Sequence, residues 1–238
     1  METIIRQKIN AIAECIFAKV QMIEEESFDY GLYSGKFGIL LFLLYYSRFS
    51  KTKKHVKITE NYAKRLFEQF IIKEELHTFC SGLSGILYLL EFLHENDFID
   101  MDVSNAQSLL DNYLVSRMRG NIQQWNYDFM HGALGVGLYF LKKRTGLEYV
   151  RELIDFLYAT ALKSADNHIF KWESFVMDKD ENFRSTYNFA LSHGMSSIII
   201  FLSRVIKSGI SDERIIEMLY GSIDSEFLTS FYYLVENK

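Results

Sequence analysis

The chain has 238 residues, of which 49% are hydrophobic and 16% aromatic, and this is enough for a large buried core. A net charge of −5 argues against nucleic-acid binding, which needs a basic face, and two cysteines do not make a disulfide framework. The longest apolar run, 37–46, is half of the ~20 residues that a membrane-spanning helix needs. We therefore expect a cytoplasmic protein that has no transmembrane segment and binds no nucleic acid.

Amphipathic helices are predicted at regular intervals along the chain. In the first, Ile5, Ile9, Ile12, Ile16 and Val20 recur at steps of three or four residues and so occupy one face. A last helix is expected to begin near Ser211, an N-cap residue type followed by two acidic residues. Three further stripes lie between them: Ile58, Tyr62, Leu66 and Phe70; Ala106, Leu109, Leu110, Tyr113 and Leu114; and Val150, Leu153, Ile154, Leu157 and Ala161.

A glycine motif followed by a strongly apolar helix occurs four times between these stripes. Three copies have the form Gly-x-x-Gly, and the fourth keeps only its first glycine. The first glycines stand at 35, 82, 132 and 194, so the steps are 47, 50 and 62 residues. Repetition at such a period is typical of a repeat architecture, in which one unit is stacked several times. The glycines to which we assign a structural role are Gly35, Gly38, Gly82, Gly85, Gly132, Gly135 and Gly194.

The alternation of one-sided and wholly apolar helices predicts two layers of helices. An all-apolar helix must be buried on most sides, whereas an amphipathic helix lies outside it. This pattern predicts an all-α fold, an α/α toroid, with the glycine motifs gathered at one end of the inner helices. With no proline and no linker composition, we expect a single domain over 1–238. Four helix pairs make a small ring, so we expect the toroid to be open or partial.

One connection, 164–187, is longer than the others. It contains alternating apolar and polar residues at 169–175, a charged tip at 178–182, and a second short stretch at 183–187. This arrangement predicts a short β-hairpin.

The residues before the glycines could carry chemistry in the third and fourth repeats. The position directly before the first glycine is serine in repeats one and two, but His131 and His193 in repeats three and four. Asp128 stands four residues before Gly132. Imidazole and carboxylate groups can move protons near neutral pH. A purely structural role, in which Asp128 caps a helix, is the alternative.

Other kinds of site have weaker support in the sequence. His77 and Cys80 could bind a metal, but no second Cys/His pair accompanies them, and zinc needs at least three protein ligands. We therefore expect no metal site in this chain. No Gly-x-Ser-x-Gly motif is present, and the glycine motifs contain no pair of carboxylates for glycosidic cleavage.

The third and fourth repeats resemble the motifs of the lanthionine synthetase C-like (LanC-like) family. Residues 128–135 match Asp-x-x-x-Gly-x-x-Gly, and residues 188–194 are similar to Asn-x-Gly-x-Ala-His-Gly. The resemblance implies a toroid of normally seven helix pairs and a cyclase that adds a zinc-bound cysteine thiolate to a dehydroamino acid. It implies catalytic roles for Asp128 and His193. We further expect His131 and Asn188 to bind substrate.

The sequence departs from the family at its metal site. The family's zinc ligands come from Cys-x-Gly and Cys-His-Gly motifs in later repeats, whereas Cys80-Ser81-Gly82 lies in the second repeat. We therefore expect no cofactor in this chain, although the complete enzyme would use zinc.

These observations leave three readings of the function open. The first is the N-terminal part of a thioether-forming cyclase, inactive in isolation. The second is a non-catalytic LanC-like module that binds peptides or acts as a scaffold. The third is an unrelated α/α-toroid glycosidase. The expected partners are a precursor peptide, a chain carrying the missing C-terminal half, or a second copy bound through the open toroid edges.

Overall fold

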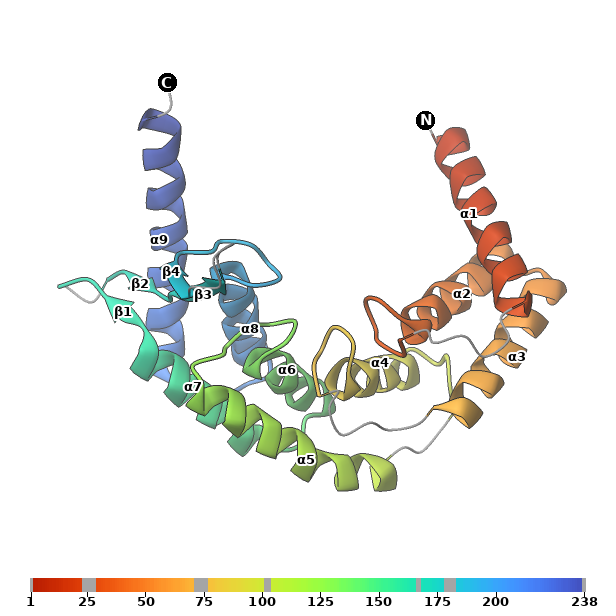
Figure 1. Cartoon of the computed structure of the whole chain (residues 1–238), viewed down its shortest axis with the longest axis horizontal. Helices are drawn as coiled ribbons and strands as arrows, with labels where there is room; N and C mark the ends of the chain where they lie inside the picture. Colours follow the sequence, from red (N-terminus) through yellow and green to blue (C-terminus); the bar gives the residue numbers. More distant parts are fainter. Residues whose placement is uncertain are drawn as a thin grey trace. The chain divides into compact units, whose positions relative to one another are not determined.

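Each of the four apolar stretches forms a helix that begins directly after the first glycine of its motif (Figure 1). The computed structural model describes residues 2–22, 29–70, 77–100, 104–165, 168–177 and 183–236. These inner helices are α2 (Lys36–Ser50), α4 (Leu83–Glu95), α6 (Ala133–Lys143) and α8 (Met195–Lys207). Their N-caps are Gly35, Gly82, Gly132 and Gly194, which confirms the predicted starts.

Outer helices alternate with the inner ones along the chain, as the amphipathic stripes predict. In the described parts of the chain they are α1 (Glu2–Met22), α3 (Lys53–Gln69), α5 (Ser104–Gln123), α7 (Leu147–Thr160) and α9 (Glu213–Glu236). Asp212, and not Ser211, caps α9, because its carboxylate accepts the N–H of Arg214 at 3.0 Å. None of the described helices meets the length and apolarity that crossing a membrane requires.

The chain divides into two compact units, Met1–Met101 and Asp102–Lys238. We call them unit 1 and unit 2 and describe each by itself, so the single domain expected over 1–238 stays a prediction. In unit 1, α2 packs against α3 and α1. Its buried residues Phe37, Leu40 and Leu43 form the core together with Tyr62 and Leu66 of α3.

The predicted stripe of α1 is wrong over its first three turns. Ile5, Ile9 and Ile12 are exposed by 52%, 39% and 54%, whereas Ala13 and Phe17 are buried. The reason is that α1 is anchored through its C-terminal half. Phe17 stacks on the His55 ring of α3 at 4.3 Å, and His55 also forms a 3.0 Å contact with Glu14.

In unit 2, α6 is the central helix. It packs against α5, α7 and α8, and every residue from 133 to 141 is buried. Polar groups toward its C-terminal end are paired with Asp111, since the hydroxyl of Tyr139 donates to this carboxylate at 2.8 Å and Lys143 lies 2.6 Å from it. The burial of α6 agrees with the prediction of a buried inner helix, whereas α2 is less enclosed, since Tyr45 and Phe49 are 49% and 54% exposed.

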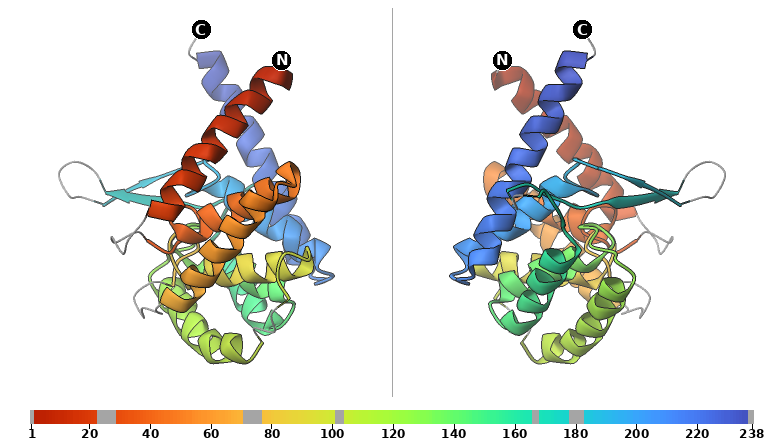
Figure 2. Two further views of the ribbon diagram at one scale, coloured as in Figure 1. Left: turned by 90° about the vertical axis from the view of Figure 1, so that its right-hand side faces the viewer. Right: turned by 90° about the vertical axis from the view of Figure 1, so that its left-hand side faces the viewer.

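Two short antiparallel hairpins follow α7. The first pairs β1 (Leu162–Lys163) with β2 (Phe170–Lys171), and the second pairs β3 (Ser174–Met177) with β4 (Phe183–Thr186). Figure 2 shows β3 and β4 extending away from the helices of unit 2. The buried Trp172 between the hairpins donates its indole N–H to the Leu157 carbonyl at 2.9 Å and so fixes the segment to α7. A hairpin is present in the predicted connection, but its first strand is 174–177, and residues 170–171 of the predicted strand 169–175 pair with β1 instead. The predicted tip, 178–182, lies outside the described residues.

Candidate active site

Three of the four loops that enter the inner helices have the same hydrogen bonding. Each has an Asp or Asn six residues before the first glycine: Asp29, Asn126 and Asn188. Its side chain accepts the N–H two residues further on, at 3.2, 3.1 and 2.8 Å respectively. Its carbonyl accepts the N–H of the first helical residue, at 2.8, 3.1 and 2.8 Å. Asn188 therefore shapes its loop, and its expected contact with substrate stays a prediction.

The first glycine of each of these loops is required by close backbone approach. A Cβ at Gly194 would lie 2.1 Å from the carbonyl oxygen of Asn188. A Cβ at Gly35 would lie 2.1 Å from the carbonyl oxygen of Asp29, and one at Gly132 would lie 2.4 Å from an Asn126 side-chain oxygen. Since no side chain fits there, glycine is needed to bring the preceding residue to the start of the helix.

The loops before α6 and α8 bring Asp128 and His193 together. The Oδ2 atom of Asp128 lies 2.6 Å from Nδ1 of His193. Because a carboxylate only accepts hydrogen bonds, Nδ1 carries the proton and Nε2 is the nitrogen that remains for chemistry. The side chains are 21% and 47% exposed, so the pair is held in place and open to a ligand. We call Asp128 and His193 the dyad.

His131 completes the cluster. Its backbone N–H donates to Oδ1 of Asp128 at 2.7 Å, so one carboxylate binds both histidines. The rings of His131 and His193 are nearly parallel, at 13°, with their centroids 5.8 Å apart. His131 is exposed, and within the described parts of the chain no hydrogen bond to its ring is found. The structure thus brings together three of the four predicted site residues.

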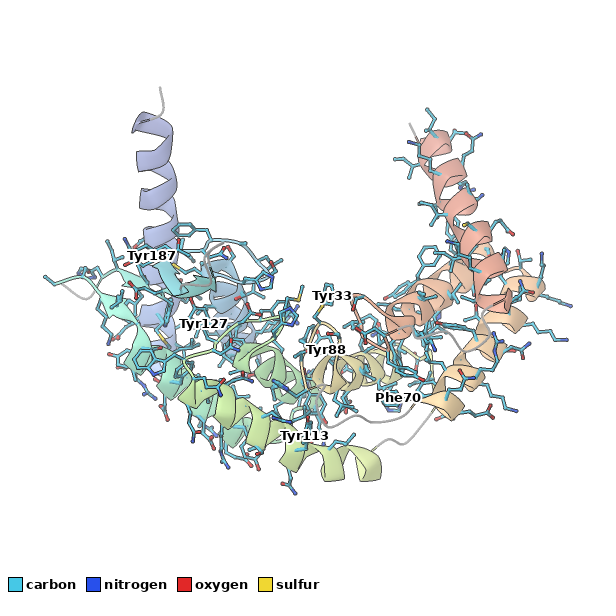
Figure 3. The ribbon with its side chains drawn as sticks, viewed as in Figure 1. Tyr33, Phe70, Tyr88, Tyr113, Tyr127 and Tyr187 are labelled. Carbon is cyan, nitrogen blue, oxygen red and sulfur yellow. The ribbon has the colours of Figure 1, made fainter. Side chains whose placement is uncertain are left out.

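Two buried hydroxyl groups, of Tyr127 and Ser174, connect the loop of Asp128 to the backbone of His193. Tyr127 and Ser174 are each less than 10% exposed, and their hydroxyl oxygens lie 3.0 Å apart. The Tyr127 hydroxyl donates to the Glu173 carbonyl at 2.8 Å, and Ser174 donates to the backbone carbonyl of His193 at 3.3 Å. Burial raises the pKa of Tyr127, and the neighbouring carboxylates add to this shift. Tyr127, labelled in Figure 3, therefore links both loops as a neutral hydroxyl.

Sequence reasoning missed Tyr127 and Ser174, since a lone tyrosine and a lone serine carry no pattern. It also missed Asp29 and Asn126, although an Asp or Asn at the same offset from glycine in three repeats was a signal that could have been found.

The helix ends beside the dyad favour negative charge. Neither α6 nor α8 has an acidic residue in its first turn, and neither N-cap glycine offers a capping side chain. The positive ends of the two helix dipoles are therefore not neutralised by residues of their own helices. The arrangement can move a proton at Nε2 of His193 next to a group that develops negative charge.

At the positions of His131 and His193, the equivalent loops of unit 1 have the serines Ser34 and Ser81. Ser34 donates to Asp29 at 3.1 Å, and the hydroxyls of Thr78 and Ser81 lie 3.4 Å apart. In the described residues, which include His77 and Cys80, no group of three or more His, Cys, Asp or Glu side chains is placed to hold a metal ion. The absence of zinc from the purified protein stays a prediction.

Comparisons with known proteins agree with the fold. A family model described as lanthionine synthetase C-like protein matches residues 26–231. No curated protein matches the sequence. Among solved structures, nisin cyclase is similar with a TM-score of 0.61 and 19% sequence identity, over 90% of this chain and 55% of that chain.

These comparisons settle the fold class and the family. The chain spans about half the length of nisin cyclase. This likeness confirms the predicted all-α, α/α-toroid fold class, and the family match excludes the reading as an unrelated toroid. The chain belongs to the lanthionine synthetase C-like family.

Proposed function

We propose that this chain provides the proton-transferring part of a peptide-modifying cyclase, which closes a thioether ring by adding a cysteine thiol to a dehydroamino acid. The observation that supports this proposal is the 2.6 Å hydrogen bond between Asp128 and Nδ1 of His193 at the adjoining loops before α6 and α8. The family match and the fold shared with nisin cyclase agree with a cyclase of this type.

The dyad suits the second half of such an addition. When sulfur attacks the β-carbon of a dehydroalanine, the electron pair of the double bond moves to the carbonyl oxygen and an enolate forms. His193, doubly protonated as an imidazolium beside the Asp128 carboxylate, then gives its Nε2 proton to the α-carbon and keeps the proton on Nδ1, which restores the ordinary peptide unit. Asp128 holds the ring in one orientation and fixes the proton on Nδ1. The N-terminal ends of α6 and α8, whose first turns hold no acidic residue, favour the negative charge of the enolate.

Zinc, which the family resemblance implies, does not fit the described residues. A catalytic zinc site needs three protein ligands, and the described residues offer no such group. The proposed role of His193 therefore includes no step at a metal.

The test is thioether formation in a synthetic peptide that contains one dehydroalanine and one cysteine. Ring closure leaves the mass unchanged, so it is followed by the loss of alkylation of the free thiol. We expect His193→Asn to lower the rate by about 10² or more, which is typical for loss of a general acid. His94→Asn is the matched control, because His94 is an exposed histidine on α4. Equal rates for His193→Asn and the wild type would contradict the proposal.

Asp128→Asn separates orientation from proton transfer. The amide keeps an oxygen for the N–H of His131, so the loop should remain folded. Its NH2 group, however, can only donate toward His193, and this favours the opposite tautomer of the ring. We expect a rate loss with unchanged thermal stability, measured by circular dichroism.

A second candidate function is peptide binding without turnover. The observation that favours it is an exposed indole ring in the loop that leads to the dyad. Trp125 is 58% exposed and lies in the loop that leads to Asp128, whereas Trp172 is buried. Peptide binding should therefore change the fluorescence of Trp125, and Trp125→Phe should abolish that change. Binding without loss of free thiol would support this candidate over the cyclase.

A further inference from the structure

We propose that a cavity beside Tyr127 binds an apolar side chain of the peptide substrate, of the size of leucine, one or two residues from the dehydroalanine. This inference rests on the proposed function and deepens it, because it names a feature by which the chain selects its peptide. The cavity lies within unit 2 and has a volume of about 80 Å³. A cavity needs about 10–15 Å³ to hold one water molecule, so this one has room for the isobutyl group of leucine.

The walls of the cavity are largely apolar. Tyr127, Phe156 and Trp172 contribute rings that are each less than 10% exposed. Three polar groups of the wall are already used, since the hydroxyls of Tyr127 and Thr160 and the indole N–H of Trp172 donate to backbone carbonyls at 2.8, 2.8 and 2.9 Å. A polar guest would lose its hydrogen bonds to water and find no free donor in these groups, whereas an apolar guest gains by leaving water.

Two large apolar side chains beside the cavity remain exposed. Trp125 and Leu162 both line it, and they are 58% and 46% exposed. Trp125 follows the C-terminal end of α5 and has a φ of 58°, in the left-handed region that bulky residues rarely adopt and where glycine is common. The indole ring thus occupies a strained position and is not buried by the fold. An apolar ligand in the cavity would cover it.

Both loops of the dyad adjoin the cavity. Tyr127, labelled in Figure 3, directly precedes Asp128 in the loop before α6 and forms part of the wall. On the other side, the wall residues 172–173 lead into Ser174, which donates to the backbone carbonyl of His193 at 3.3 Å. A peptide that presents its dehydroalanine to the dyad therefore passes the cavity with a neighbouring residue, because consecutive Cα atoms are only about 3.8 Å apart.

The test measures the affinity of the full chain for labelled peptides by fluorescence anisotropy. Each peptide has one dehydroalanine among alanine and glycine residues and carries a single leucine, asparagine or lysine one or two positions before or after it. Serine replaces cysteine, so that no ring closes. Asparagine is close to leucine in shape but polar. At the best position, we expect leucine to bind about 10- to 100-fold more tightly than asparagine, as burial of a leucine side chain implies.

Two variants connect this preference to the cavity. Trp125→Gly removes the exposed ring and relieves the strained backbone, and Leu162→Trp narrows the opening at a position that is already exposed. We expect both variants to remain folded by circular dichroism and to reduce the preference for leucine by about tenfold. Tyr220→Ala is the matched control, because Tyr220 is a 63% exposed aromatic residue of α9, outside the cavity.

Each outcome decides a different point. Equal affinity for leucine and asparagine at every position would overturn the inference and leave the proposed function to its own test, thioether formation. A preference for leucine that persists in both variants would also overturn it, since another surface would then bind the side chain. Tighter binding of lysine than of leucine would overturn it as well, because Glu173 would then pair with a cation at the cavity. A preference that both variants lose, without thioether formation in the cysteine peptide, would support the cavity and contradict the cyclase.

Discussion

Gly194→Ala is the sharpest test of how the fold positions the dyad. The added Cβ would lie 2.1 Å from the backbone oxygen of Asn188 and 2.5 Å from its carbonyl carbon, a distance that no relaxed structure tolerates. Overpacking of this kind costs about 1–3 kcal/mol. Moving the loop also breaks the 2.8 Å hydrogen bond from the N–H of Met195 to Asn188, which adds about 1 kcal/mol. The expected loss of stability is therefore about 2–4 kcal/mol.

Thermal unfolding followed by circular dichroism measures this effect. For a chain of this size, each kcal/mol lowers Tm by about 2–4 °C, so we expect a fall of about 4–16 °C. The matched control is Gly120→Ala, because a Cβ at Gly120, inside α5, meets no atom within 4 Å. That change should raise stability by about 0.5–1 kcal/mol. A Tm for Gly194→Ala within a degree of the wild type would refute the close-approach argument.

Three further predictions address the support of the site, alkaline stability and the exposed face of α1. Ser174→Ala removes the hydroxyl between Tyr127 and the His193 carbonyl, so kcat should fall several-fold with unchanged peptide affinity; equal kcat would contradict this. Burial raises the pKa of Tyr62 to about 12, so its contribution to stability is complete below its unfolded pKa of 10.0 and is lost as pH rises through about 12. Urea unfolding at pH 8 and 11 should show this loss, and Tyr62→Phe should reduce it. Ile9→Asp should leave Tm unchanged, because Ile9 is exposed, and should lower the self-association expected from open edges, as measured by light scattering.

The repeat pattern predicted most of the fold, because the burial of apolar side chains decides which helices lie inside. A helix such as α6, apolar on every side, has no stable position except the interior, so its place follows from its composition. The glycine before each inner helix was likewise visible in the sequence, and all four became N-caps. The α1 stripe failed for a related reason: periodicity shows that a face is apolar but not that a neighbouring helix covers it.

The candidate site was only partly predictable. Asp128, His131 and His193 stand just before the first glycines of repeats three and four, and this predicted that they lie near one another. Their hydrogen bonds, however, depend on loop geometry that the repeat pattern does not encode. The support from Ser174 depends on a hairpin strand that brings its hydroxyl to Tyr127, which lies 47 residues earlier in the chain. A contact between residues so distant in sequence, made by a single hydroxyl, has no local signature.

The side chain of Asp128 both shapes the loop before α6 and holds the ring of His193. One of its oxygens binds the backbone N–H of His131 and thereby shapes the entry to α6, and the other binds the ring of His193 at the entry to α8. A carboxylate can do both because it accepts at two oxygens and donates at neither. The positions in unit 1 that correspond to Asp128 are Gly31, which has no side chain, and Thr78, whose single hydroxyl lies 3.4 Å from that of Ser81 in its own loop. The same repeat unit therefore forms a turn with small polar groups in unit 1 and, in unit 2, the hydrogen-bonded cluster that we propose as the acid–base site.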